Sequence, residues 1–474
     1  MAHRFLLRLL FVRMFYIIKC MEKMMINKRI QKEYNSKLVS ADQAAAMVQD
    51  GYKLNFGDNI CLAYDFDIAL ARRINELHNI VIITNINPRK EPFECYKAAE
   101  STENVRFISA HFGAVDRKMN KEGNTWFMPM LFHEYAGYMR NIVHPDITVL
   151  QVAPMDEEGN FYYGPQVAGS AAHPEASKKL IVEVNRNLKQ AHGIQNKIPL
   201  SDVDHIIEGS DPPLIEVPVP VPGECDIKIA GNIAQLVEDE STLQLGIGAL
   251  PTAVGKALAQ SDISEIYCHT EVIADPYVDM YEAGKLRGNK YADDGKIIYG
   301  GVIGDRRVYD FVENNELCCC APIEYINDYS VVSAIDRFVS VNGCLAADMF
   351  GQVSSESVGF QHVSGTGGQL DFALAAYASK GGRSFLCMHS TRTLRDGRVI
   401  SNIVPYFEPG TIVTTPRSAV HYIVTEYGAV CLKGKSTYER AEALVSIAHP
   451  DFREELIRHA EKAGIWSRTS RISF

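Results

Sequence analysis

Short apolar runs alternate with amphipathic segments along most of the chain. The runs are rich in β-branched residues and have the length of buried strands, whereas segments such as ADQAAAMVQDG and PTAVGKALAQ carry apolar residues at helical spacing. The strand-like runs are Asn79–Thr84, Asp146–Ala153, Lys179–Val184, Ser241–Ile247, Arg337–Asn342 and Thr411–Thr415. This alternation predicts an α/β fold with largely parallel sheets.

The same order of elements occurs in both halves of the chain. KLNFGDNICLAYDFDIALARRINELHNIVIITN and STLQLGIGALPTAVGKALAQSDISEIYCHTEV each give a strand, a glycine turn, a helix and a second strand. A proline-rich stretch between them, SDPPLIEVPVPVPGE, favours an extended linker. We therefore predict two similar open α/β domains, at residues 28–209 and 225–474, with a linker at 210–224 and the active site in the cleft between the domains.

The first residues are apolar, but three basic side chains interrupt them. A helix that crosses a bilayer needs about 20 consecutive apolar residues, and no small-residue cleavage site follows. We interpret residues 1–27 as an extension outside the fold, with Met21, Met24 and Met25 as candidate start residues; an interfacial helix is the alternative.

Composition narrows the class of protein. The chain has 474 residues, a formal net charge of −10 and no long basic run, which favours two or three domains and argues against a nucleic-acid partner. Its eleven cysteines are scattered without C-x-x-C spacing, as expected of buried reduced thiols in a cytoplasmic protein. His133-Glu134 lacks the second histidine of a zinc motif, so we expect no metal.

Two glycine-rich loops are candidates for anion binding. In LQLGIGALP, Gly246 and Gly248 allow the backbone to approach a ligand at a helix start, whereas Pro251 replaces the third glycine of a dinucleotide fingerprint. In VSGTGGQLDF, residues 363–372, three glycines can expose amides to an oxyanion. Each loop has a structural alternative, a tight connection between elements.

A single carboxylate, Glu271, stands between two apolar runs in SEIYCHTEVIADP, where the first run is expected to end as a strand. It could equally be a first-turn acid of a helix that begins at Thr270 or Asp275. Serine–histidine–aspartate catalysis has no support, because the chain lacks a G-x-S-x-G motif. The candidate nucleophiles are therefore a carboxylate or a cysteine.

Taken together, the segments from about Lys37 onward resemble the class I CoA-transferases of the acetyl-CoA hydrolase/transferase family. The specific motifs are STLQLGIGALP, HTEVIADPYVDMYEAG, YDFVENN, GQVSSES, VSGTGGQLDF, IVTTPRSAVHYIVTEYG and ERAEALVSIAHPDFREEL. VDMYEAG and SGTGGQLDF resemble the butyryl-CoA:acetate group most, and the 4-hydroxybutyrate group next.

The resemblance assigns roles to individual residues. It implies that Glu271 is the nucleophile, that the turn Gly246, Ile247, Gly248, Ala249 and Leu250 lines the thioester end of CoA, and that Asn342 and Gly365 hold CoA or a second oxyanion. Two departures from the family pattern leave the acceptor acid open. Residues 61–67 lack the usual glycine–proline turn, and Asp275-Pro276 replaces Asp-Gly.

The resemblance implies a CoA-transferase that moves CoA from a short-chain acyl-CoA, with butyryl-CoA expected, to a carboxylate, with acetate expected. The intermediate would be a glutamyl–CoA thioester, and CoA would be a substrate, so no cofactor is expected. A 4-hydroxybutyrate- or propionate-type transferase and an acyl-CoA hydrolase are the alternatives; a non-catalytic ligand sensor is a third. We expect a cytoplasmic homodimer or higher homo-oligomer without membrane or nucleic-acid partners.

Overall fold

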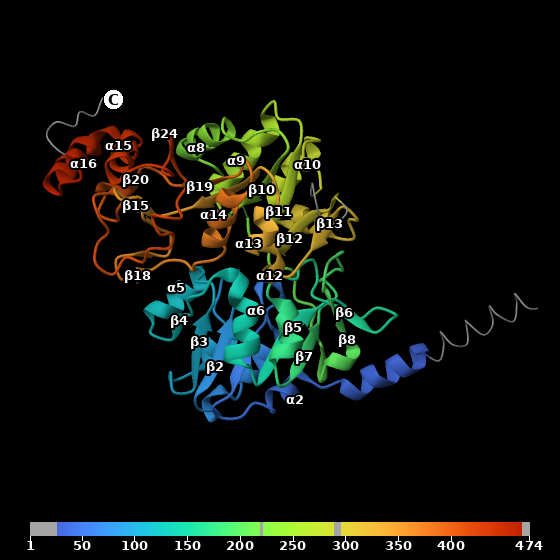
Figure 1. Cartoon of the computed structure of the whole chain (residues 1–474). Helices are drawn as coiled ribbons and strands as arrows, with labels where there is room; N and C mark the ends of the chain where they lie inside the picture. The colour runs from blue at the N-terminus through green and yellow to red at the C-terminus, as the bar shows by residue number, and fades with distance from the viewer. Residues whose placement is uncertain (1–25, 219–220, 289–294, 467–474) are drawn as a thin grey trace, which may run out of the picture.

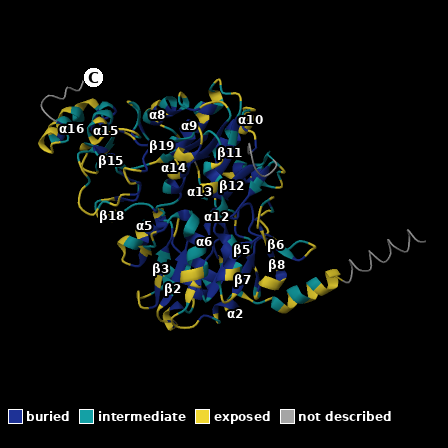
Figure 2. Ribbon diagram, in the orientation of Figure 1, coloured by how far each residue is buried: buried dark blue, intermediate teal, exposed yellow. Residues whose placement is uncertain are grey.

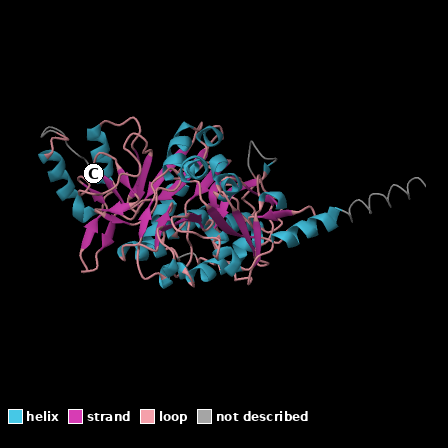
Figure 3. Ribbon diagram, turned by 90° about the horizontal axis from the view of Figure 1, so that it is seen from below, coloured by secondary structure: helices cyan, strands magenta, loops and turns pink. Residues whose placement is uncertain are grey.

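The computed structural model describes residues 26–218, 221–288 and 295–466. Figure 1 shows two α/β domains, the first in blue and teal and the second in green to orange, with a smaller red segment beside the second. Their sheets lie between helices in the perpendicular view of Figure 3. Figure 2 shows that the sheets are buried while exposed residues gather at the periphery. The prediction of two α/β domains is confirmed; the precise domain boundaries stay predictions.

The first domain contains a seven-stranded parallel sheet in the order β4-β3-β2-β1-β5-β7-β9. Its strands are β1 (Lys53–Asn55), β2 (Ile80–Thr84), β3 (Val105–Ser109), β4 (Thr125–Phe127), β5 (Ile147–Val152), β7 (Leu180–Val184) and β9 (His205–Glu208), and β6 (Asn160–Tyr162) pairs with β8 (Lys197–Pro199). Its helices are α2 (Ala41–Ala45), α3 (Asp65–Ala71), α4 (Glu94–Ala98), α5 (Ala114–Lys121), α6 (Tyr135–Tyr138) and α7 (His173–Ala176). The described chain is also helical over residues 26–37.

The second domain repeats this plan in an eight-stranded sheet, β13-β12-β11-β10-β14-β19-β23-β24. Its strands are β10 (Ser241–Leu245), β11 (Ile266–Ile273), β12 (Ile297–Val302), β13 (Cys318–Cys320), β14 (Phe338–Gly343), β19 (Arg383–Cys387), β23 (Tyr422–Thr425) and β24 (Gly428–Cys431). All neighbours pair in parallel except β23 and β24. The order β3-β2-β1-β5-β7 therefore corresponds to β12-β11-β10-β14-β19, which accounts for the repeated sequence pattern.

Helices and small strand pairs complete this half. The helices are α8 (Glu224–Ala234), α9 (Ala249–Gln260), α10 (Asp275–Glu282), α11 (Arg306–Val312), α12 (Ile323–Ile326), α13 (Tyr329–Ser333), α14 (Gln369–Ala378), α15 (Thr437–Ser446) and α16 (Pro450–Lys462). The small strands are β15 (Ala346–Asp348), β16 (Val353–Ser354), β17 (Ser357–Val358), β18 (Gln361–His362), β20 (Thr391–Thr393), β21 (Val399–Ser401) and β22 (Ile403–Val404). In the described parts of the chain, no helix combines the length and apolar character that a membrane crossing requires.

Most of the strand-like runs form strands, but Thr411–Thr415 does not. Only Thr415 makes an isolated bridge, to Val353. The hydroxyl oxygens of Thr411 and Thr414 accept hydrogen bonds from the backbone N–H groups of Gly359 and Ser355, at 3.1 and 2.9 Å. Pro416 then ends the run. Side-chain bonding to a neighbouring loop therefore replaces the strand ladder here.

Backbone hydrogen bonds join the two domains along the edge of the second sheet. The Cys320 N–H donates to the His192 carbonyl at 2.9 Å, and the Ile194 N–H donates to the Cys320 carbonyl at 2.8 Å. Ala168 is linked in the same way, because its N–H donates to the Gly300 carbonyl at 3.1 Å. A loop of the first domain thus continues the second sheet beyond β13.

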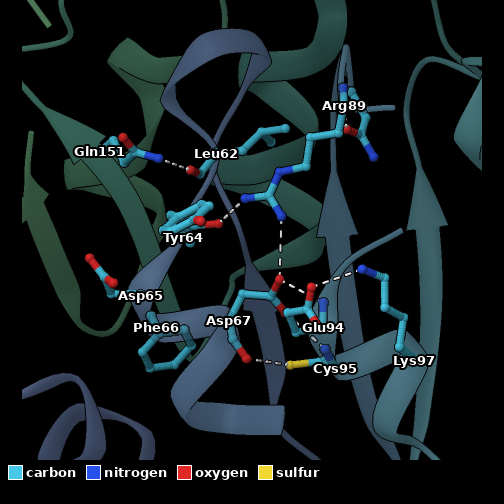
Figure 4. Close-up of polar contacts among 12 residues, drawn as sticks. Leu62, Tyr64, Asp65, Phe66, Asp67, Arg89, Glu94, Cys95, Lys97 and Gln151 are labelled. Carbon is cyan, nitrogen blue, oxygen red and sulfur yellow. Dashed lines mark hydrogen bonds and ion pairs between the residues drawn. The ribbon is translucent and has the colours of Figure 1, made fainter. Parts of the chain in front are cut away.

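The 61–67 segment, which departs from the family pattern, is held by a buried carboxylate (Figure 4). Asp67 accepts hydrogen bonds from the backbone N–H groups of Glu94 and Cys95, at 2.8 and 3.0 Å, and contacts the Arg89 guanidinium at 3.3 Å. Because these groups satisfy one another within the first domain, the cluster fixes the position of α3 against α4.

Candidate active site

Glu271 lies within a strand, and not past its end as the apolar pattern suggested. β11 continues through Ile273 because Val272 and Ile273 still pair with Gly301 and Val302 of β12. The helix that was the alternative explanation for Glu271 begins only at Asp275. The sheet therefore sets the position of the carboxylate directly, which is more rigid than a loop.

The Glu271 carboxyl faces a cavity of about 210 Å³ between the domains. The first domain contributes Ile86 and His111 to the lining; the second contributes Gln244, Leu245, Gly246, Ile247, Glu271, Val272, Ile303, Asn342, Gly343, Ser355, Ser364, Gly365, Thr366, Gly367, Gly368 and Gln369. The cavity lies at the carboxyl ends of β10 and β14, where the strand order of the second sheet reverses. Ligands of open α/β sheets bind at this kind of switch point.

The structure brings together five of the eight residues singled out from the sequence. Glu271, Gly246, Ile247, Asn342 and Gly365 line the same cavity. The other three, Gly248, Ala249 and Leu250, form the start of α9 beside it and are not in its lining. The roles assigned to these eight residues stay predictions.

The turn before α9 contains Gly246 and Gly248, and each is glycine for a different structural reason. Gly248 has φ +118°, a left-handed conformation that side chains rarely adopt, so the turn into α9 requires glycine whatever the ligand. Gly246 lies against Asn342, because a Cβ placed on it would stand 3.3 Å from the Asn342 Oδ1. The Asn342 amide is held in turn by a reciprocal pair of hydrogen bonds with Gln244, at 3.0 and 3.2 Å.

The glycine that approaches Glu271 most closely is Gly368, whereas the family resemblance singled out Gly365 of the same loop. A Cβ on Gly368 would stand 2.0 Å from the Glu271 Oε2. Gly365 packs instead against the first domain, where a Cβ would stand 3.1 Å from the His111 Cα. Gly365 therefore allows the loop to pack against the first domain, and Gly368 allows it to pack against the Glu271 carboxylate.

The surroundings of Glu271 weaken its acidity. Burial above all, together with the negative charges of Asp371 and Asp58, raises the pKa of Glu271 to about 7. Two donors act in the opposite direction: the Asn327 Nδ2, 2.8 Å from the Glu271 Oε2, and the Gly368 backbone N–H. The carboxyl thus titrates near neutral pH, and two hydrogen-bond donors already contact it.

Asp58 brings a second buried carboxylate from the first domain. It follows β1 and accepts a hydrogen bond from the Gly169 N–H at 3.1 Å. Burial raises the pKa of Asp58 to about 6. Sequence reasoning missed Asp58, Asn327 and Asp371, because each lies in a different segment and no motif links them.

Two family models match the sequence of this chain. Residues 21–219 match the model of the acetyl-CoA hydrolase/transferase N-terminal domain, and residues 304–460 match that of the C-terminal domain. The chain is 41% identical to the butyryl-CoA:acetate CoA-transferase of Anaerostipes caccae over 448 residues, 93% of this chain and 99% of the relative. This chain belongs to the acetyl-CoA hydrolase/transferase family. The family resemblance seen in the sequence is confirmed, and with it the expectation of an enzyme of the CoA-transferase type.

Two further proteins are similar to this chain over nearly its whole length. The 4-hydroxybutyrate coenzyme A transferase of Clostridium kluyveri is 34% identical over 431 residues, 90% of this chain and 98% of the relative. The crystal structure of RipA from Yersinia pestis superposes with a TM-score of 0.83 at 32% identity, covering 92% of this chain and 100% of that chain. This chain therefore shares the fold of RipA.

Proposed function

We propose that this protein transfers CoA from a short-chain acyl-CoA, butyryl-CoA first, to acetate, with Glu271 as the nucleophile. The observation that carries the proposal is a carboxylate that faces an interdomain cavity and is met there by two hydrogen-bond donors, Asn327 and Gly368. Ile86, Val272 and Ile303 add an apolar wall suited to a short acyl chain. The names of the two similar transferases support acyl-CoA and carboxylate as substrates.

The chemistry proceeds through two covalent intermediates. Ionised Glu271 attacks the acyl-CoA carbonyl carbon; the carbon–sulfur bond breaks, leaving a mixed anhydride and CoA thiolate. The thiolate then attacks the glutamyl carbonyl carbon, and the acyl group departs as a free carboxylate, leaving a glutamyl–CoA thioester. Acetate reverses both steps and leaves as acetyl-CoA. Covalent catalysis divides one difficult exchange into easier ones, and water must be kept from both intermediates.

The proposed reaction needs no metal or redox cofactor, since carboxylate and amide groups supply the nucleophile and the oxyanion donors. We propose a cytoplasmic protein that acts as a homodimer or higher homo-oligomer, with acyl-CoA and a short-chain carboxylate as its ligands. Sedimentation of the purified protein measures the oligomeric state.

A substrate panel tests the reaction. The protein is incubated with acetyl-, propionyl-, butyryl- or 4-hydroxybutyryl-CoA, with and without isotopically labelled acetate, and the CoA esters are measured by mass spectrometry. We expect labelled acetyl-CoA to form fastest from butyryl-CoA. CoA release that does not depend on acetate would identify a hydrolase instead. Binding of acyl-CoA without any turnover would make the protein a ligand sensor.

The acidity of Glu271 predicts a pH profile. Burial raises the pKa of Glu271 to about 7, so the carboxyl gains a proton, and loses its nucleophilic charge, as the pH falls through that value. We expect kcat/KM for butyryl-CoA to be constant above about pH 8 and to fall roughly tenfold per pH unit below about pH 6. Initial rates across this range measure it; a flat profile would show that ionisation of Glu271 does not limit the reaction.

A further inference from the structure

The side-chain amide of Asn327 bridges two carboxylates. Its Nδ2 lies 2.8 Å from the Glu271 Oε2 and 3.2 Å from the Asp371 Oδ2, so both hydrogens of the amide are engaged. The opposite orientation would place the amide oxygen against two carboxylates, and the contacts therefore define which atom is nitrogen. Asn327 is 1% exposed, at the end of α12, so its side chain is shielded from bulk water.

Asp371 is held in turn by the other domain. It lies in the first turn of α14 and is 5% exposed. Its Oδ1 is 2.8 Å from the Nδ1 of His133, and its Oδ2 also accepts from the His133 backbone N–H at 3.4 Å. The hydrogen bond to Asp371 raises the pKa of His133, and the nearby charges of Glu134 and Asp328 act in the same direction. The His133 side chain is 40% exposed and belongs to the first domain.

We propose that Asn327 is a catalytic residue and that Asp371 and His133 are its positioning residues. Asp371 accepts one Asn327 N–H and so aims the other at the Glu271 Oε2, while His133 fixes Asp371 across the domain junction. The Glu271 Oε1 is then left to attack the acyl carbon. This inference rests on the function proposed above. It connects the reacting carboxylate to three residues, Asn327, Asp371 and His133, which we call the His133 relay.

The relay acts most strongly in the second covalent step. When CoA thiolate attacks the Cδ of Glu271, negative charge develops on the Oε2, and the bond from Cδ to Oε1 then breaks as the acyl group leaves with Oε1 as a carboxylate. Asn327 already faces Oε2, and the Gly368 N–H donates to the same carboxyl. Donors fixed in advance around a developing oxyanion need no reorganisation at the moment of reaction.

Four variants test the relay. Asn327→Leu keeps the size of the side chain and removes the donor, so kcat should fall about 10²–10³-fold, while KM for butyryl-CoA stays within about threefold. Asp371→Asn no longer fixes which way the Asn327 amide points, and a smaller loss, about 10-fold, should follow. His133→Ala should also lower kcat. His133→Asn should restore much of it, because an asparagine amide can donate to Asp371 from near the Nδ1 position.

The pH profile gives a readout that a purely structural role would not change. The Asn327 donor favours the ionised form of Glu271, so Asn327→Leu should move the acid limb of kcat/KM to higher pH. The charged groups around Glu271, namely Asp371 and Asp58, are unchanged in this variant. If Asn327→Leu does not fold, as judged by thermal melting, the loss of kcat in Asp371→Asn serves instead; the acid limb of that variant should move to lower pH, because the Asp371 charge is removed.

The chain supplies a matched control pair. Asp226, in the first turn of α8, is also 2.8 Å from a half-exposed histidine, His389, with 46% of that side chain exposed. This pair makes no contact with Glu271. His389→Ala should therefore leave kcat and the pH profile unchanged, which separates the loss of a histidine–aspartate pair from the loss of the relay.

The outcomes distinguish the relay from the proposed function. A wild-type protein that transfers no CoA from any acyl-CoA would overturn the proposed function. If the wild type transfers CoA and Glu271→Gln does not, but folded Asn327→Leu keeps the wild-type kcat and pH profile and folded Asp371→Asn keeps the wild-type kcat, then the relay is wrong and the proposed function stands. A loss of kcat with a shifted acid limb, at nearly constant KM, supports the relay.

Discussion

Replacing Glu271 with glutamine is expected to abolish CoA transfer while leaving the protein folded. Glutamine keeps the size of the side chain but removes the charge that attacks the thioester. Glu271→Asp keeps the charge and withdraws it by one methylene, and a misplacement of about 1 Å can lower the rate on the order of 10²-fold. With butyryl-CoA and no acceptor acid, the wild type should accumulate CoA on Glu271, which borohydride or hydroxylamine traps for peptide mass spectrometry.

Glu183 provides a matched control for this experiment. It is a buried carboxyl of the first domain whose pKa burial also raises to about 7, but it accepts hydrogen bonds from the backbone N–H groups of residues 64–66 and does not face the cavity. Glu183→Gln should lower the melting temperature, because both carboxylate oxygens accept backbone N–H bonds and an amide nitrogen cannot, and it should leave kcat unchanged. Glu271→Gln should not lower it, because folding no longer has to bury an ionised group there. Wild-type transfer by Glu271→Gln, after excluding slow deamidation, would contradict the mechanism.

Adding a single methyl group at Gly368 is expected to disable the site. The Cβ of Gly368→Ala would stand 2.0 Å from the Glu271 Oε2 and 2.3 Å from the Asn327 Nδ2, closer than nonbonded atoms can approach. The carboxylate or the loop must therefore move, and we expect kcat to fall on the order of 10²-fold or more. Steady-state kinetics on the folded variant measure this loss.

Gly231→Ala is the control for this substitution. Gly231 lies in the middle of α8, and a Cβ there would meet no atom within 4 Å beyond its own helix. Alanine favours a helix interior over glycine by about 1 kcal/mol, so this variant should be at least as stable as the wild type and equally active. Full activity of Gly368→Ala would mean that Glu271 works from a different position during turnover.

The fold of this molecule could be predicted from the sequence better than its active site. β-branched runs bounded by turn residues became β2, β5, β7, β10 and β14, because burial on both faces of a parallel sheet demands that composition. The repeated order of elements correctly indicated two similar domains. Helix length was less well predicted, since the amphipathic segment after Ser40 is helical only over Ala41–Ala45.

The relay could not be predicted in the same way. Glu271, Asn327 and Asp371 are separated by more than forty residues at each step and meet only when β11, α12 and α14 pack together. Nor could the composition of VSGTGGQLDF indicate which glycine approaches the nucleophile. That choice depends on the path of the loop, which places Gly365 against His111 and Gly368 against Glu271.

The hydrogen bonds between Cys320 and residues 192–194 have a consequence for biosynthesis. β13 is the edge strand of the second sheet, and an unpaired edge is a template on which another chain can add and aggregate. In this protein a loop of the first domain caps that edge. Because domains generally fold in order from the N-terminus as the ribosome releases them, we expect this loop to be in place when β13 emerges. The order of the two halves along the chain would then protect the edge of the newly made sheet from pairing with other chains.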